Sequence, residues 1–371
     1  MLALWIRKPF GRRTTRKPHP SSRPILRVEA LEDRTVPSTL TVTTVADNGP
    51  GSLRADIVAA QDGDTIVFDP SLAGQTIYLT SGELAITTNL TIEGTPSWNP
   101  PAINALENSR VIDVASSASL AIDNLLIEGG SAKKGGGLYN AGAVTLSDCS
   151  FHFNSATDGG AIENNGTMTV TNCDLSYDVA LHNGGAIDNK GDLTVGGVWG
   201  CGFAADSANS AGGAISNFGT MNLVNSSFYR TFSSKGGAVA NFGNATLGNC
   251  AIVDCGADDG GGILNQANMT VAGSYFSGGA ERGGGIYNSG NLVLSRSVLV
   301  SNAASVAGGG IYNSGTLVVD ACTINGNVAV ANGGGGVFNA GTLTVSNSFF
   351  CLNSPEDIFG TYIDGGGNTF C

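Results

Sequence analysis

Gly283-Gly284-Gly285-Ile286-Tyr287-Asn288 and Gly308-Gly309-Gly310-Ile311-Tyr312-Asn313 are the clearest copies of one short phrase that recurs along this chain. The phrase consists of two or three glycines, an aliphatic residue, a variable residue and an asparagine. It occurs nine times between residues 135 and 341, and successive asparagines lie 23 to 28 residues apart. A period in this range predicts a solenoid, in which each repeat buries its apolar side only against neighbouring repeats. The nine asparagines are Asn140, Asn164, Asn189, Asn217, Asn241, Asn265, Asn288, Asn313 and Asn339.

The residues between two of these asparagines alternate with the period of a β-strand. In the copy that begins at Gly283, Ile286, Leu292 and Leu294 are expected to face inward. A bend near Ser295 is then followed by a third strand. Three short strands and three bends per repeat predict an all-β fold, a right-handed parallel β-helix of about 25 residues per coil. Ankyrin-like and tetratricopeptide-like folds are excluded because the sequence has no amphipathic runs of helix length.

The glycines and the asparagine that recur in each copy of the phrase have a physical reason within such a fold. Stacked coils lie about 4.8 Å apart, so every bend recurs in register. A bend that needs a positive φ or a close backbone approach therefore demands glycine in coil after coil. Each asparagine is expected to bond to the asparagine of the next coil, which satisfies polar groups of the bend that would otherwise be buried without partners.

The chain divides into an arm and a repeat body. Residues 1–38 are basic and show no periodicity, which predicts a disordered N-terminal arm. Residues 39–371 are expected to form the β-helix, with an N-terminal cap at 39–68, regular repeats at 135–353 and a C-terminal tail at 354–371. Ser52 is expected to N-cap a short helix that covers the open apolar end of the first coil. The tail is expected to cap the last coil only weakly.

The charge is unevenly distributed between these parts. The arm holds nine of the 18 lysines and arginines and three acids, whereas the rest of the chain carries nine bases against 27 acids. So acidic a body should repel nucleic acid, because binding phosphates requires clustered lysine and arginine. No stretch approaches the roughly 18 to 20 consecutive apolar residues of a transmembrane helix, so none is expected.

The end of the arm resembles a known sorting motif. The stretch Leu26-Arg27-Val28-Glu29-Ala30-Leu31-Glu32-Asp33-Arg34-Thr35-Val36-Pro37-Ser38 resembles an N-terminal LEDRTVPS motif of many predicted exported and surface proteins of planctomycete bacteria. The resemblance implies export, so we expect a secreted or cell-surface bacterial protein. The alternative is a flexible basic tail with no sorting role.

The repeats resemble a second family. The phrase GGAI occurs at 159–162, 184–187 and 212–215, and an F-x-x-N motif occurs at 151–154 and 350–353. Both motifs are similar to the repeats of chlamydial polymorphic outer-membrane proteins and related bacterial right-handed β-helix proteins, over roughly residues 115–355. The resemblance implies display at a surface and a role in adhesion.

Five of the eight cysteines recur at one position of the coil. They are Cys149, Cys173, Cys201, Cys250 and Cys322. Serine fills the same position in other coils, so we interpret it as a small inward-facing slot in which a free thiol behaves as a small apolar group. Two disulfides remain open alternatives, Cys149 with Cys173 and Cys351 with Cys371. No C-x-x-C spacing indicates zinc.

The parallel β-helix also hosts polysaccharide lyases and hydrolases, so catalysis must be tested on individual residues. The variable residue before each asparagine is expected to face outward. Stacking would place Glu163 beside Asp188, with carboxyl groups about 5 Å apart, as in retaining glycosidases. Such a pair would raise one pKa, and it could equally hold a Ca²⁺ ion. The alternative is two surface acids without a function.

The same position carries Tyr287, Tyr312 and Phe338 in three successive coils. Stacked aromatic rings can receive sugar rings or the apolar surface of a partner. Alternatively, the rings only stack on one another. Taken together, these features favour an exported, non-catalytic β-helix that acts as a surface, matrix or adhesin-like scaffold and binds glycan or a cell-surface protein without a cofactor. The alternative function is a polysaccharide lyase or glycoside hydrolase that acts at Glu163 and Asp188.

Overall fold

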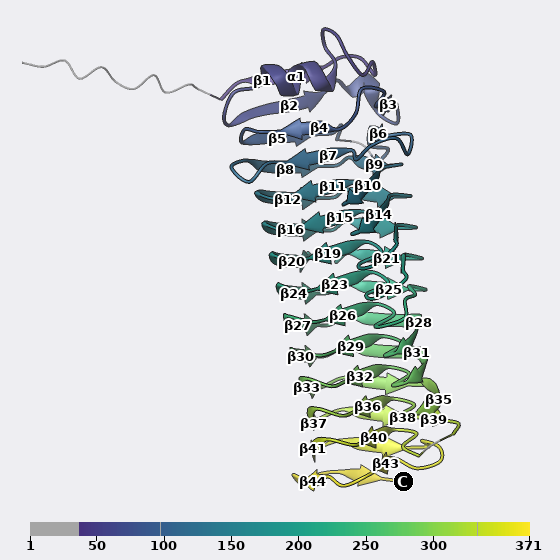
Figure 1. The fold of residues 1–371 in the computed structure, drawn as a ribbon. Coiled ribbons are helices and arrows are strands. Elements are labelled where there is room, and N and C mark those ends of the chain that lie inside the picture. The colour runs from purple at the N-terminus through teal and green to yellow at the C-terminus, as the bar shows by residue number, and fades with distance from the viewer. Residues whose placement is uncertain (1–36, 97, 332) are drawn as a thin grey trace, which may run out of the picture. The chain divides into compact units, whose positions relative to one another are not determined.

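The computed structural model describes residues 37–371 apart from residues 97 and 332. Most of the predicted arm, residues 1–36, therefore lies outside the described residues, as does most of the sorting-like motif. Pro37–Cys371 forms one compact unit. Its strands stack in successive coils of a right-handed parallel β-helix, as the repeat spacing predicted (Figure 1).

Three long parallel sheets run along the stack, and we number them I, II and III. Sheet I contains β1 (Thr39–Val42), β2 (Asp64–Phe68), β5 (Leu90–Glu93), β8 (Ser119–Asp123), β12 (Ala143–Ser147), β16 (Thr167–Thr171), β20 (Asp192–Gly196), β24 (Thr220–Val224), β27 (Asn244–Gly248), β30 (Asn268–Ala272), β33 (Asn291–Ser295), β37 (Thr316–Asp320), β41 (Thr342–Ser346) and β44 (Ile363–Asp364).

Sheet II follows sheet I within each coil. It contains β3 (Thr76–Tyr78), β6 (Ala102–Asn104), β9 (Leu126–Glu128), β13 (Ser150–His152), β17 (Asp174–Ser176), β21 (Gly202–Ala204), β25 (Ser227–Tyr229), β28 (Ala251–Asp259), β31 (Tyr275–Arg282), β34 (Val298–Val300), β35 (Ala303–Ala307), β38 (Thr323–Asn325), β39 (Val328–Ala329), β42 (Phe349–Cys351) and β45 (Thr369–Phe370).

Sheet III carries the repeated phrase, and the ladder asparagines end most of its strands. It contains β4 (Leu84–Ile86), β7 (Ile112–Val114), β11 (Leu138–Asn140), β15 (Ile162–Asn164), β19 (Ile187–Asn189), β23 (Ile215–Asn217), β26 (Val239–Asn241), β29 (Ile263–Asn265), β32 (Ile286–Asn288), β36 (Ile311–Asn313), β40 (Val337–Asn339) and β43 (Ile358–Phe359).

Some coils have a fourth strand between sheets II and III, which the three-strand prediction missed. These strands form a small sheet of β10 (Ser131–Lys134), β14 (Ser155–Asp158), β18 (Val179–Ala180) and β22 (Ser207–Ala208). In later coils the same stretch joins sheet II, either as the second half of a long strand such as β28 or as a separate strand such as β35.

The core is a set of stacked apolar columns inside the three sheets. Ile286, Leu292, Leu294 and Leu299 are all buried, as their alternation predicted. In sheet II the rings of Phe203 and Phe228 stack with centroids 4.7 Å apart. Each coil therefore gains its apolar contacts from the coils above and below it, which is the energetic basis of a solenoid.

The glycines allow the chain to bend between coils. Gly283 has φ +64, a conformation that L side chains rarely adopt, and an added Cβ would collide with the carbonyl oxygen of Ile286. An added Cβ on Gly284 would collide with the carbonyl oxygen of Gly309 in the next coil. The first glycine therefore serves the turn and the second serves the close approach of neighbouring coils.

A short helix covers the N-terminal end of the core, as predicted. Helix α1 (Leu53–Ala59) begins after Ser52, whose hydroxyl accepts a hydrogen bond from the backbone N–H of Ala55. Leu53 is buried against the core. The guanidinium of Arg54 contacts Asp47 at 2.8 Å, which fixes the helix to the preceding loop. A 3₁₀ turn, η1 (Pro70–Leu72), follows β2.

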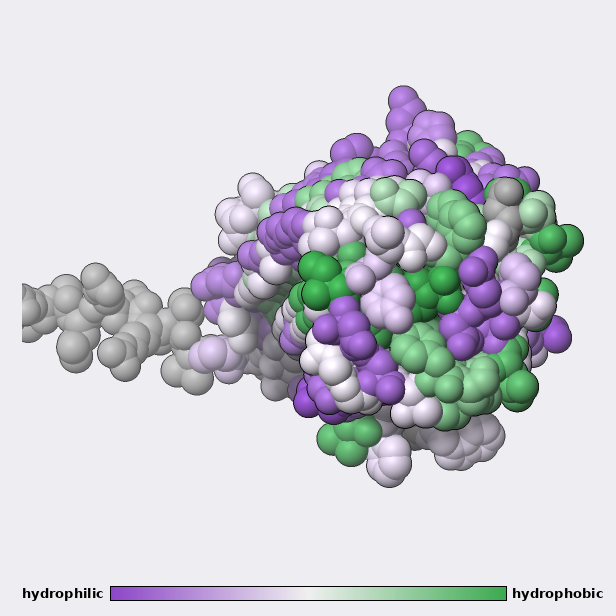
Figure 2. Space-filling view, turned by 90° about the horizontal axis from the view of Figure 1, so that it is seen from below, coloured by the Kyte–Doolittle hydropathy of each residue, from purple (hydrophilic) through white to green (hydrophobic). Residues whose placement is uncertain are grey.

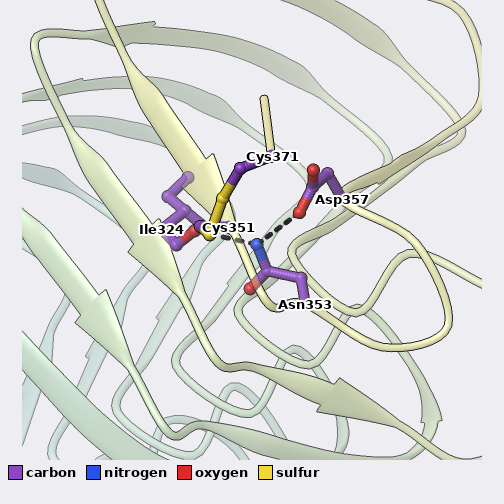
Figure 3. Close-up of a disulfide and its surroundings, with 5 residues drawn as sticks. All are labelled: Ile324, Cys351, Asn353, Asp357 and Cys371. Atoms are coloured by element: carbon purple, nitrogen blue, oxygen red, sulfur yellow. Dashed lines mark hydrogen bonds between the residues drawn. A yellow bond between two sulfur atoms is a disulfide. The ribbon is translucent and has the colours of Figure 1, made fainter. Parts of the chain in front are cut away.

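The C-terminal tail differs from the prediction, because it forms a further coil rather than a loose cap. Strands β43, β44 and β45 pair in register with β40, β41 and β42. A disulfide joins Cys351 to Cys371, and Asn353 donates hydrogen bonds to Ile324 and Asp357 beside it (Figure 3). Figure 2, which looks onto this end, shows hydrophobic residues among polar ones at the surface.

A second polar ladder runs through the bend after each sheet II strand. The backbone N–H of Asn154 donates to Oδ1 of Asp178 at 2.8 Å, and that of Asp178 donates to Oδ1 of Asp206 at 3.0 Å. Farther along, the N–H of Asn302 donates to Oδ1 of Asn327 at 3.0 Å. All five side chains are buried, so the ladder satisfies backbone groups that have no strand partner.

Candidate functional site

The variable residues before the ladder asparagines form one continuous column on the outer side of sheet III. The in-register pairing of β11 through β43 places each of them directly against its counterpart in the next coil. We call this set the pre-asparagine column. Its members, in order, are Tyr139, Glu163, Asp188, Ser216, Ala240, Leu264, Tyr287, Tyr312 and Phe338, and Phe359 of β43, which precedes a glycine, continues the column by pairing with Phe338.

The asparagine ladder beneath holds this column in place. The side-chain amide of Asn140 donates to Oδ1 of Asn164 at 2.7 Å, and the same bond recurs coil by coil to Asn339. Asn164 also donates to the carbonyl of Asp192 in the next coil. These asparagines are buried. Because each bend is tied to the next, the outward side chains of the column have fixed positions and fixed spacing.

The acidic part of the column is buried, which corrects the expectation of two outward surface acids. Glu163 and Asp188 both have an exposed fraction of 0%. Lys190 lies over them, with its Nζ 3.0 Å from Oε1 of Glu163 and 2.7 Å from Oδ2 of Asp188. A second ammonium, that of Lys134, lies 2.9 Å from the same Oε1 of Glu163. The prediction that the two acids are exposed was wrong because it did not consider the long side chains of Lys134 and Lys190, which lie over them.

Burial and charge set the protonation of this cluster. Burial raises the pKa of Asp188 to about 6, partly opposed by Lys190 and reinforced by the carboxylate of Glu163. Burial would lower the pKa of Lys190, but its contacts with Asp188 and Glu163 outweigh burial, and the pKa is raised. A lysine with a raised pKa stays protonated near neutral pH, so Lys190 is unsuited to remove a proton from a substrate.

The cluster also offers little to a metal ion. Among the residues that the structure describes, no group of three or more His, Cys, Asp or Glu side chains could hold one. Two lysine ammonium groups already occupy the carboxylate side of Glu163. Ca²⁺ prefers six to eight oxygen ligands, and two buried acids beneath two ammonium groups do not resemble such a set.

The far part of the column is a stack of aromatic rings. Ring centroids lie 4.9 Å apart for Tyr287 and Tyr312, 5.0 Å for Tyr312 and Phe338, and 5.0 Å for Phe338 and Phe359, with interplanar angles of 8° to 9°. The first three rings are partly exposed, and Phe359 is exposed. The guanidinium of Arg282 lies 5.1 Å from the ring centre of Tyr287 and 5.7 Å from that of Tyr312. The stack thus presents ring edges and one cation along the outer surface.

Two further aromatic residues extend this surface toward the acidic cluster. The rings of Phe218 and Phe242 stack 4.8 Å apart. Phe242 packs with Tyr287 against a small buried cluster that includes Leu264 and Ala240. Phe218, Phe242 and Phe359 were not predicted from the sequence as residues of this surface. Phe218 and Phe242 could have been found from the sequence, because each directly follows a ladder asparagine and the two lie in successive coils.

The cysteines and Asp259 lie outside the pre-asparagine column. Cys149 and Cys173 are buried free thiols, so a disulfide between them is wrong, whereas the structure does contain the bridge from Cys351 to Cys371. Asp259, one of the two adjacent acids at the end of β28, pairs with Arg282 at 2.8 Å. It therefore supports the cation of the aromatic stack.

Comparison with known proteins confirms the fold class and little else. The sequence matches no protein-family profile and no curated protein. Among solved structures, the chain is similar to the alginate lyase AlyF-OU02 in complex with G6, with a TM-score of 0.53, 12% identity, and coverage of 92% of this chain and 85% of that chain. It also aligns with the pectate lyase Pel9A, with a TM-score of 0.32, 15% identity, and coverage of 90% and 80%. At 12% identity the likeness to the alginate lyase concerns architecture alone.

Proposed function

We propose that this chain is an exported, non-catalytic β-helix scaffold that binds polysaccharide along the outer side of sheet III. The observation that carries the proposal is the stack of Tyr287, Tyr312, Phe338 and Phe359 with Arg282 over its first rings. The two tyrosines are suited to sugars because each combines an apolar ring with a hydroxyl that can form hydrogen bonds, and Phe338 and Phe359 extend the apolar surface. A repeat of about 4.8 Å offers successive rings to successive sugars of one chain.

The charge of the body favours a neutral polysaccharide. Beyond residue 38 the chain carries nine bases against 27 acids. Lys134, Lys190 and Arg282 are each paired with an acid of the same surface, so little positive charge remains for a uronate. A polyanionic glycan would therefore meet net repulsion unless a divalent cation bridged it to the protein. The location we propose is the cell surface or the extracellular matrix, in an adhesin-like role.

A second candidate function is cleavage of polysaccharide at Glu163 and Asp188. The observation that favours it is the stacking of two carboxyl groups, one with a pKa of about 6, within a fold similar to that of an alginate lyase. The burial of both acids and the raised pKa of Lys190 argue against it, since neither a proton donor nor a base reaches the surface. We therefore rank binding first.

One experiment separates the two functions. The full chain is incubated with neutral and acidic polysaccharides, with and without Ca²⁺, and both retention on the polymer and release of unsaturated or reducing ends are measured. We expect retention by a neutral polymer without release of any product. Product release that Glu163→Gln or Asp188→Asn abolishes would instead make the chain an enzyme. Absence of retention by every polymer would contradict the binding proposal.

A further inference from the structure

One carboxylate oxygen of Glu163 is shared by a lysine amine and a primary amide. Nζ of Lys134 lies 2.9 Å from Oε1 of Glu163. Nδ2 of Asn165 donates a hydrogen bond of 3.2 Å to the same oxygen atom. An amine that can act as a nucleophile, an amide that can accept it and a carboxylate that can carry protons between them therefore meet at one point.

The fold brings these three groups together from two successive coils. Lys134 is the last residue of β10, whereas Glu163 belongs to β15 in the next coil and Asn165 follows that strand directly. Tyr139 of β11 contacts both reacting side chains. Its hydroxyl accepts a hydrogen bond of 2.9 Å from Nδ2 of Asn165, and its ring centre lies 5.8 Å from Nζ of Lys134. The amine and the amide are thus held near one another before any reaction, which lowers the entropic part of the barrier.

The burial of Glu163 favours transfer of a proton from the lysine. The side chain of Glu163 is fully buried, while that of Lys134 is half-exposed. Transfer of a proton from the ammonium to this carboxylate converts an ion pair into two neutral groups, and it removes the cost of keeping a charge away from water. Asn165 is only partly buried, so a small leaving group released from its side chain has a path to solvent.

A second lysine contacts the same oxygen but is less suited to react. Nζ of Lys190 lies 3.0 Å from Oε1 of Glu163 and 2.7 Å from Oδ2 of Asp188. These two acids raise the pKa of Lys190, so this amine keeps its proton. Among the described residues, Lys134 forms an ion pair with Glu163 alone. Lys134 is therefore the better nucleophile of the two.

We propose that Lys134 and Asn165 become joined by an isopeptide bond, with Glu163 as the carrier of protons. Lys134 gives a proton to Glu163, and the lone pair of Nζ attacks Cγ of Asn165. The bond between Cγ and Nδ2 then breaks, and its electron pair stays on Nδ2. Nζ loses two protons in all, Glu163 passes them in turn to Nδ2, and the leaving nitrogen departs as ammonium. The carboxylate is regenerated, and no oxidant or reductant is consumed.

The bond would connect two neighbouring coils across the outer side of sheet III. The coils are otherwise held to each other by hydrogen bonds and apolar contacts, which separate together when the chain unfolds. A covalent link between residues 134 and 165 restricts the unfolded chain, as a disulfide does. This proposal does not depend on polysaccharide binding, because the reaction needs only the folded chain itself.

The test is an accurate mass of the full chain with its disulfide reduced, taken after incubation until the mass no longer changes, and followed by peptide mapping. Lys134→Arg keeps the positive charge but removes the amine that attacks. Glu163→Gln keeps the shape of the side chain but cannot carry a proton. The matched control is Lys133→Arg, the same change at the exposed neighbouring lysine. Circular dichroism checks the fold of each variant.

We expect the native chain and the Lys133→Arg control each to be lighter than its sequence by one ammonia, and the peptides that contain Lys134 and Asn165 to be recovered joined. Lys134→Arg and Glu163→Gln should have the full mass of their sequences. The native chain decides the proposal even where a variant fails to fold, because its full mass would overturn it.

Three other results would also overturn the proposal. Loss of one water in place of ammonia would place the bond between Lys134 and Glu163. A joined peptide that contains Lys190 in place of Lys134 would identify the wrong amine. Loss of ammonia in Lys134→Arg would show that Asn165 cyclises with the backbone nitrogen of Gly166 and not with a lysine.

Discussion

The backbone N–H of Asp178 donates a 3.0 Å hydrogen bond to Oδ1 of Asp206, and both carboxyl groups are fully buried. Asparagine occupies the same ladder elsewhere, and the side-chain amide of Asn327 donates to the carbonyl oxygen of Leu299. The corresponding atom of each aspartate, Oδ2, has no hydrogen-bond partner. A carboxylic acid can supply the missing donor only when protonated, so the two aspartates replace asparagines as neutral groups.

This arrangement predicts that stability falls as pH rises. Burial raises the pKa of both Asp178 and Asp206 well above the ordinary value of 3.8, and the carboxylate of Asp174 adds to the effect. The folded chain therefore binds more protons than the unfolded chain above pH 3.8, and the free energy of unfolding decreases from there until the raised pKa is passed. Urea unfolding from pH 3.5 to pH 8 measures the trend.

Replacement of these acids tests the assignment directly. Asp178→Asn with Asp206→Asn should raise the free energy of unfolding at pH 7 and weaken its pH dependence, because an amide needs no proton to donate. The exposed Asp192→Asn serves as the control and should change neither. If the free energy of unfolding depends on pH in the double variant as it does in the native chain, ionisation of the two carboxyl groups does not destabilise the fold, and the assignment is contradicted.

The second prediction concerns the ammonium of Lys190. Lys190→Met removes a positive charge from Glu163 and Asp188, which stay buried. We expect a loss of about 2 kcal/mol at pH 7, less than the full cost of unpairing a buried charge because Lys190 is partly solvated. Lys235→Met is the control, since this exposed lysine has no ion pair among the described residues. Equal effects of the two changes would contradict the role of Lys190.

The third prediction concerns the titration of Asp188. Its carboxyl group should titrate near pH 6, and Glu163→Gln should lower that midpoint because the neighbouring negative charge is removed. Carbon-13 NMR of the side-chain carboxyl groups measures both values. A midpoint at or below pH 4 in the native chain would show that burial does not outweigh the attraction of Lys190, and would contradict this prediction.

The fourth prediction concerns the asparagine ladder. Asn241→Ala removes the acceptor of Asn217 and the donor to Asn265, both of which are fully buried. We expect a loss of about 3 kcal/mol, because each buried polar group left unpaired is costly. Asn222→Ala on the exposed side of sheet I should change stability by less than about 0.5 kcal/mol. Similar losses in both variants would contradict the ladder's role.

The fold could be read from the sequence because it rests on a repeated local rule. Ile286, Leu292 and Leu294 follow strand alternation, and Ser52 follows the pattern of a helix N-cap. The burial of Glu163 could not be read in this way, because it depends on Lys134 and Lys190, which come from other coils and other rows. The further coil at 354–371 also escaped prediction, since it lacks the glycine-rich phrase.

The central claim, that the aromatic stack binds polysaccharide, is tested most directly by Tyr287→Ala with Tyr312→Ala. Binding of the full native chain and of this variant to the best retained neutral polysaccharide is measured by calorimetry, with Tyr275→Ala and Tyr229→Ala on sheet II as the matched control. We expect at least a tenfold loss of affinity in the first variant, about 1.4 kcal/mol, and none in the control. Unchanged affinity in a folded Tyr287/Tyr312 variant would contradict the account.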